Sequence, residues 1–148
     1  MTVSAQHTAG KTVALVGNPN TGKTTLFNAF TGLSQKVGNY AGVTVESLKG
    51  GLTLSSGDSV ELLDLPGIYS LAAQSVDQRI AVDILFGRQE GIAPLDAVLA
   101  VVDASNLARN LYLISQIVET EVPMVIALNM SDLAKSRGID VNAAQLAS

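Results

Sequence analysis

The residues most suited to chemistry lie in one short string near the start of the chain, GNPNTGKTT. It fits the pattern G-x-x-x-x-G-K-S/T, whose fixed positions here are Gly17, Gly22, Lys23 and Thr24. Glycines in such a loop let backbone N–H groups converge on a phosphate chain, the lysine supplies positive charge to the β- and γ-phosphates, and the hydroxyl ligates Mg²⁺. The string therefore predicts a nucleotide-phosphate site formed by Gly17, Asn18, Pro19, Asn20, Thr21, Gly22, Lys23, Thr24 and Thr25.

A second string, DLPG, runs from Asp64 to Gly67. A carboxylate at a strand end can hold Mg²⁺ in nucleotide hydrolases, so Asp64 is a predicted metal ligand, and Gly67 is expected to offer its N–H to the γ-phosphate. Many such enzymes then have a glutamine that orients water, but here the position is Ile68. Because isoleucine forms no side-chain hydrogen bond, we expect slow basal hydrolysis, with water oriented by backbone groups. The nearest candidate for a charge-neutralising arginine is Arg79, whose helical context favours a surface position.

A third string, NMSD, selects the base through Asn129, Met130 and Asp132. A carboxylate can accept hydrogen bonds from N1–H and the 2-amino group of guanine, whereas adenine would leave Asp132 unpaired, at a cost. Asn129 is expected to contact guanine and to brace the phosphate loop. An alternative is that Ser131 and Asp132 merely cap a helix. Because this string comes after a phosphate loop and a DLPG string in the same chain, guanine recognition is the preferred interpretation.

One further hydroxyl is expected to reach Mg²⁺ when a γ-phosphate is present and to withdraw afterwards. Thr44 is the candidate, because it directly precedes a predicted strand in the string GVTVE. Ser34, Ser47 and Thr53 are the alternatives, but none of them has that position. Thr44 is therefore predicted to be a catalytic residue and a magnesium ligand.

The order of elements explains how these motifs could meet. Short apolar runs predict buried strands at 12–17, 60–67, 95–105 and 122–129, of which the second is the return strand of an antiparallel hairpin around the turn SSGDS. Helical spacing predicts helices at 22–32, 75–87, 107–120 and 141–148, with Gly32 as a stop and Asn142 as a cap. The segment 33–46 lacks periodicity and is predicted to be a long loop. Alternating strands and helices predict an α/β fold with a mostly parallel sheet and helices on both faces.

Composition limits the possible functions. The 148 residues are 47% hydrophobic and 15% charged, as expected for one domain with a sizeable core. A net charge of −4 argues against nucleic-acid binding, and a chain without cysteine has neither disulfides nor thiolate metal sites. No apolar run is long enough to cross a bilayer or to act as a signal peptide. We expect no catalytic role for His7, and core positions for Leu85, Phe86 and Tyr112.

Five strings together resemble the N-terminal G domain of the ferrous iron transport protein FeoB family: GNPNTGKTTLFN, VGNYAGVTVE, DLPGIYSL, DASNLARNLYL and NMSD. The resemblance covers nearly the whole chain from Lys11. It implies a Ras-like P-loop GTPase fold over residues 1–148 and a cytoplasmic GTPase that regulates ferrous iron transport by a linked permease in the bacterial inner membrane. It also implies that the chain is truncated before the fifth guanine motif. The family commonly has proline at Ala41 and tryptophan at Tyr40, and methionine is usual at Met130.

The same resemblance gives Asn20 a second role. Potassium-activated GTPases have asparagine at this loop position, so Asn20 is expected to ligate K⁺ beside the phosphates, together with backbone carbonyls near Gly38–Tyr40. The alternative is that Asn20 only suits a tight turn. Two further alternatives concern the whole domain: a regulatory module that hydrolyses GTP too slowly to act as an enzyme, or a ribosome- or tRNA-associated GTPase. The oligomeric state stays open.

Overall fold

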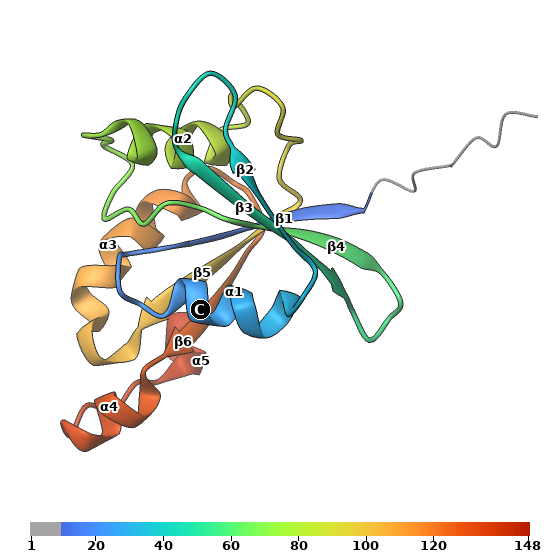
Figure 1. Ribbon diagram of the computed structural model, residues 1–148. Helices are drawn as coiled ribbons and strands as arrows, with labels where there is room; N and C mark the ends of the chain where they lie inside the picture. Colours follow the sequence, from blue (N-terminus) through green and yellow to red (C-terminus); the bar gives the residue numbers. More distant parts are fainter. Residues whose placement is uncertain (1–9) are drawn as a thin grey trace, which may run out of the picture.

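Six β-strands form one mixed sheet in the computed structural model, which describes residues 10–148 (Figure 1). Their spatial order is β2-β3-β4-β1-β5-β6. The strands are β1 Lys11–Gly17, β2 Gln35–Asn39, β3 Glu46–Thr53, β4 Ser59–Asp64, β5 Ala97–Asp103 and β6 Met124–Asn129. The helices are α1 Lys23–Thr31, α2 Val76–Leu85, α3 Leu107–Val118, α4 Ser131–Ser136 and α5 Ala143–Leu146, with a 3₁₀ turn at Ala104–Asn106.

The parallel part of the sheet is built from strands that are apolar along their length. β1 pairs in parallel with β4 and β5, and β5 pairs in parallel with β6. Parallel neighbours need crossover connections, which α2 and α3 supply after β4 and β5. β3 and β4 form the predicted antiparallel hairpin. The predicted α/β fold with a mostly parallel sheet is confirmed.

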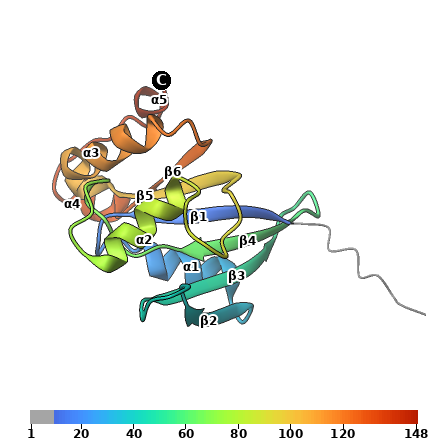
Figure 2. The ribbon, with the colours of Figure 1, turned by 90° about the horizontal axis from the view of Figure 1, so that it is seen from above.

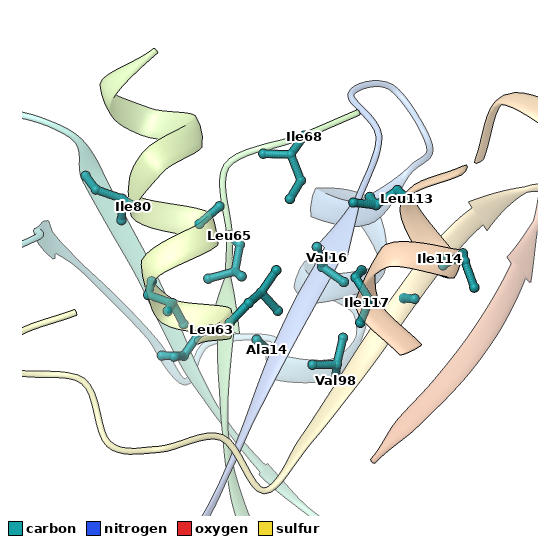
Figure 3. Close-up of a cluster of buried hydrophobic side chains, with 14 of the residues drawn as sticks. Ala14, Val16, Leu63, Leu65, Ile68, Ile80, Val98, Leu113, Ile114 and Ile117 are labelled. Atoms are coloured by element: carbon teal, nitrogen blue, oxygen red, sulfur yellow. The ribbon is translucent and has the colours of Figure 1, made fainter. Parts of the chain in front are cut away.

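Helices cover both faces of the sheet (Figure 2). The side chains of β1 alternate between the two layers. Ala14 and Val16 face the larger cluster, where α2 and α3 contribute side chains such as Ile80 and Leu113 (Figure 3). Leu15 faces the smaller cluster, which contains Phe27 of α1. The sheet is therefore held between α1 on one face and α2 and α3 on the other.

The prediction of an irregular loop over residues 33–46 is wrong in its first part. Residues 35–39 form β2, which pairs antiparallel with β3 so that Val37 lies opposite Leu48. β2 is an edge strand, and all of its residues after Gln35 are exposed. Such a strand shows no alternation of buried and exposed residues, because backbone pairing rather than side-chain burial forms it. Residues 40–45 are irregular, as predicted.

Several smaller expectations can be compared with the structure. Gly32 ends α1 with a φ of 53°, and the Asn142 side chain caps α5 by accepting a hydrogen bond from the Gln145 N–H. Leu85 is buried, but Phe86 is 49% exposed and Tyr112 is 60% exposed, so core positions for those two aromatic residues were wrong. His7 lies outside the described residues. Among residues 10–148, no helix combines the length and apolar character that crossing a bilayer requires.

Candidate functional site

The predicted motifs meet at the carboxyl ends of neighbouring parallel strands. β1 ends at Gly17, β4 at Asp64 and β6 at Asn129. A cavity of about 450 Å³ opens at this edge and is lined by Asn18, Pro19, Asn20, Gly22, Lys23, Thr24, Thr25, Gly67 and Asp77. The edge formed by strand carboxyl ends is where open α/β sheets bind ligands.

A larger cavity, of about 900 Å³, lies elsewhere. It is lined by residues near the starts of β1 and β4, such as Thr12 and Val60, and by Lys36 and Lys49 of the antiparallel strands. None of the predicted site residues lines it. Size is therefore a poor guide here, and we place the functional site at the smaller cavity, where the motifs converge.

The phosphate loop requires glycine at two of its fixed positions. Gly22 has a φ of 84°, and a Cβ atom there would lie 2.2 Å from Nδ2 of Asn129. A Cβ on Gly17 would lie 2.6 Å from the backbone oxygen of Val101. Asn20 also has a positive φ, of 64°, which asparagine tolerates better than most residues. The close approach of Gly22 to Asn129 joins the phosphate loop to the predicted base motif.

Lys23 and Asp64 form an ion pair at the floor of the site. Nζ of Lys23 donates to Oδ1 of Asp64, and their side chains are only 9% and 8% exposed. The hydroxyl of Thr24 donates to the other carboxylate oxygen of Asp64 at 3.1 Å. Hydroxyl and carboxylate oxygens are ligands that Mg²⁺ prefers, so the convergence of Thr24 on Asp64 fits a magnesium site.

The base motif contacts the phosphate loop directly. Nδ2 of Asn129 donates to the backbone oxygen of Thr21 at 2.9 Å, the bracing contact that the sequence predicts. Met130, with a φ of 59°, is the N-cap residue directly before α4, and no side chain caps that helix. Asp132 lies exposed in its first turn. Since neither Ser131 nor Asp132 caps α4, the alternative explanation of the motif is wrong.

The segment 33–46 carries the predicted magnesium ligand Thr44, and none of its residues lines the cavity. Thr44 and Asn20 are both exposed, but of the two only Asn20 lines the cavity. Gly38 and Asn39 belong to β2, which pairs with β3, and neither residue lines the cavity. The structure thus brings together the phosphate loop, Asp64 and Asn129. Thr44 and residues 38–40 are absent from the lining of the cavity.

One polar residue at this cavity, Asp77, was not singled out from the sequence, and a predicted one, Asn18, has an unexpected environment. Asp77 lines the cavity from the first turn of α2, and the Ser75 hydroxyl that donates to its carboxylate lowers the pKa of Asp77. The spacing of Ser75 and Gln78, a capping box, could have indicated this helix start. Asn18 is buried, and within residues 10–148 neither atom of its side-chain amide has a hydrogen-bond partner.

Tyr40, the first residue of the irregular stretch 40–45, is buried in the larger core cluster. Its hydroxyl has no hydrogen-bond partner among the described residues. Burial, and secondarily the charge of Asp64, raise the pKa of Tyr40 to about 12. Because the folded protein holds this proton more tightly than the unfolded chain, the contribution to stability is complete below about pH 10 and is lost as the pH rises through about 12.

Tyr40→Phe is expected to remove this loss of stability in alkaline solution. The free energy of unfolding of the wild type should fall by about 2–3 kcal/mol more than that of the variant between about pH 9 and pH 12, following the shift in pKa. Near neutral pH the variant should be at least as stable, because it buries no unpaired hydroxyl. Urea unfolding of both proteins across this range checks the prediction, which parallel curves would contradict.

The sequence profile of the family described as ferrous iron transport protein B matches residues 11–148. The Fe(2+) transporter FeoB of Escherichia coli K12 is 46% identical over 134 residues, covering 88% of this chain. The cytosolic domain of Legionella pneumophila FeoB is 46% identical with a TM-score of 0.83, covering 92% of this chain and 52% of that chain.

Several of the similar structures contain bound GDP. A variant of S. thermophilus NFeoB bound to GDP is 45% identical, with a TM-score of 0.80, and the match covers 92% of this chain and 51% of that chain. The chain spans only 17% of the E. coli relative and about half of these solved domains. The likeness in fold and sequence therefore concerns one part of a longer transporter.

Proposed function

The chain belongs to the FeoB family of ferrous iron transport proteins, and we propose that residues 1–148 are its GTP-binding and GTP-hydrolysing domain. The observation that carries this proposal is the convergence of Lys23, Thr24 and Asp64 beside a phosphate loop that Asn129 braces. One edge of the sheet thus brings together residues suited to binding phosphate and Mg²⁺, next to the first residue of the proposed guanine motif.

The roles of the individual residues follow from their positions. Lys23 would bind the β- and γ-phosphates, which would replace Asp64 as its partner. Thr24 and Asp64 would hold Mg²⁺, which when bound neutralises phosphate charge. Asp132 would accept hydrogen bonds from guanine, beside Asn129 and Met130.

Hydrolysis further requires two segments to close on the nucleotide, the segment 33–46 with Thr44 and the segment that follows Asp64 with Gly67. Gly67 lies against Pro19 of the phosphate loop, where its N–H would meet the γ-phosphate, and Thr44 would move in as a second hydroxyl ligand of Mg²⁺. Ile68 is fully buried, so its side chain has no access to water at the phosphates. We therefore propose a slow intrinsic rate, with water oriented by backbone groups.

The proposed physiological role is regulation of ferrous iron transport. GTP and GDP are the proposed ligands, and the proposed partner is a membrane-embedded permease domain of the same protein, with this domain at the cytoplasmic face of the bacterial inner membrane. The likeness to FeoB transporters supports this role. The acidic net charge of −4 weighs against a ribosome- or tRNA-associated GTPase.

We also propose that K⁺ activates hydrolysis through Asn20. In the transition state, charge between the β- and γ-phosphates must be balanced, which many GTPases achieve with an arginine. Asn20 lines the cavity together with Lys23, and its amide oxygen is a suitable ligand for K⁺. Arg79, the nearest arginine in sequence, is exposed on α2 and does not line the cavity.

GTP and ATP turnover with Mg²⁺, in potassium and in sodium, tests the proposal. We expect binding and hydrolysis of GTP but not ATP, at least about tenfold faster in potassium, because a bound cation would act where an arginine otherwise gives larger accelerations. Asn20→Ala should be equally slow in both salts. Asn28→Ala, an exposed asparagine on α1, is the matched control and should keep the salt dependence.

The outcomes separate the alternatives. Equal wild-type rates in the two salts would end the role of K⁺ while leaving the GTPase intact. GTP binding with no turnover above the uncatalysed rate would instead identify a regulatory binding module. Failure to bind guanine nucleotide would contradict the proposed function itself.

A further inference from the structure

The backbone that follows Gly67 is fixed at three successive points. Ile68 is fully buried in the core, and its N–H donates to the backbone oxygen of Gly17 at 3.1 Å (Figure 3). The ring of Tyr69 lies 4.3 Å from the guanidinium carbon of Arg109. The N–H of Leu71 donates to Oε1 of Gln116 at 2.8 Å. Residues 68–71 are therefore fastened to β1 on one side and to α3 on the other.

The contacts from α3 come from one face of that helix. Arg109, Tyr112 and Gln116 are spaced by three and four residues, so they lie one above another. The amide of Gln116 is oriented from both ends, because its Nε2 donates to the Tyr112 hydroxyl at 3.5 Å while its oxygen accepts from Leu71. Tyr112 is 60% exposed, so this face of α3 does not pack in the core. It contacts the segment 68–71 through Arg109 and Gln116.

The fastening ends at Leu71. Among residues 10–148, the N–H groups of Ala72, Ala73 and Gln74 donate to Ser70, Leu71 and Gln78 respectively, all within the same stretch of chain. Residues 68–71, which follow the phosphate loop contact of Gly67, are thus held by elements distant in sequence. Residues 72–74, which lead into α2, are held by hydrogen bonds to residues near them in sequence.

We propose that Arg109 and Gln116 are positioning residues for GTP hydrolysis, an inference that rests on the proposed function. They hold the backbone of residues 68–71, which follows Gly67 at the phosphate loop, so that backbone groups there that make none of these contacts can orient water where the side chain of Ile68 cannot. Backbone groups can do this only if they are fixed, since a misplacement of about 1 Å can lower a rate by about 100-fold. Gly67 is already pressed against Pro19, with only 3.0 Å between a Cβ built on Gly67 and Cγ of Pro19.

Arg109→Ala is expected to lower the single-turnover rate at saturating GTP about tenfold while changing the Kd for GTP less than about twofold. Tyr69→Ala should have the same effect, and the double variant should be no slower than either, because both remove one contact. Tyr69→Phe keeps the ring and should restore the rate. Gln116→Ala should be slow, whereas Gln116→Glu keeps the oxygen that accepts from Leu71 and should be faster than the alanine variant.

Arg88→Ala is the matched control. Arg88 also lies over an aromatic ring, 4.9 Å from the centroid of Phe86, and is exposed, but it is outside the proposed site. Its removal should leave the rate unchanged. Thermal unfolding of every variant shows whether a slow rate reflects loss of fold.

The proposal is overturned if Arg109→Ala and Gln116→Ala hydrolyse GTP as fast as Arg88→Ala. It is also overturned if their rate loss is matched by an equal loss of GTP affinity or of thermal stability, which would indicate a merely structural role. A wild-type domain that hydrolyses GTP while these variants are unaffected leaves the proposed function standing. A wild type without GTP hydrolysis contradicts the proposed function and this inference together.

Discussion

Lys23→Ala is expected to lower the affinity for GTP at least about 100-fold and to abolish measurable turnover. A lysine on the β- and γ-phosphates donates charge-assisted hydrogen bonds, each worth about 1.5–3 kcal/mol, so the loss of two accounts for a change of this size. Lys23 is the positively charged side chain among the residues that line the cavity, and it is only 9% exposed at its side chain. No neighbour in that lining can replace its charge.

The same variant also leaves the carboxylate of Asp64 without its ion pair. Breaking a buried pair costs about 3 kcal/mol of folding free energy, so the unfolding of Lys23→Ala must be measured beside its GTP affinity by calorimetry. Lys36→Ala, an exposed lysine on β2, makes the same change in net charge away from the cavity and serves as the control. A folded Lys23→Ala protein that binds GTP as tightly as this control would remove Lys23 from the phosphate site.

Asp132→Asn is expected to reverse the base preference from guanine to xanthine. The carboxylate of Asp132 can accept from N1–H and the 2-amino group of guanine, but an asparagine would set its own N–H donor against one of those donors. Xanthine has a carbonyl oxygen at that carbon, which can accept from the asparagine. Sites built on such bonds discriminate by about 10⁴ or more, so we expect GTP affinity to fall at least about 100-fold and xanthosine triphosphate to bind more tightly than GTP.

Competition between the two nucleotides for the wild type and the variant measures this reversal. Asp140→Asn is the matched control, because Asp140 is an exposed carboxylate beyond α4 and the substitution removes the same charge. Unchanged preference in Asp132→Asn would show that Asp132 does not contact the base. The bracing bond from Asn129 to Thr21 would then be the whole contribution of the NMSD string.

Sequence patterns predicted the fold where side-chain burial forms it. The parallel strands carry apolar runs, and the hairpin is marked by the turn between β3 and β4, so both could be read from residue types. β2 could not, because its residues are mostly exposed and only pairing with β3 makes it a strand. Helical spacing also failed to say which stripe of α3 faces the core, and Tyr112 proved to lie on the exposed side.

The site was predictable to the extent that it depends on motifs at strand ends. Lys23, Asp64 and Asn129 come together because parallel strands place their carboxyl ends at one edge. The stacking of Arg109 on Tyr69 could not be predicted, because it arises from the packing of two segments distant in sequence. The position of Thr44 was equally inaccessible, since a switch residue is expected to have more than one position.

The burial of Ile68 has a consequence for how this catalytic strategy can change over evolution. Its side chain is fully buried in the larger core cluster. A mutation to glutamine would place an amide among apolar neighbours, and an unpaired buried amide costs about 1–3 kcal/mol or more. The substitution would therefore weaken the fold without delivering a side chain to the water. A protein with this core therefore cannot acquire a water-orienting glutamine at position 68 by a single substitution. Selection for faster hydrolysis must act on the surrounding backbone or on the bound ions.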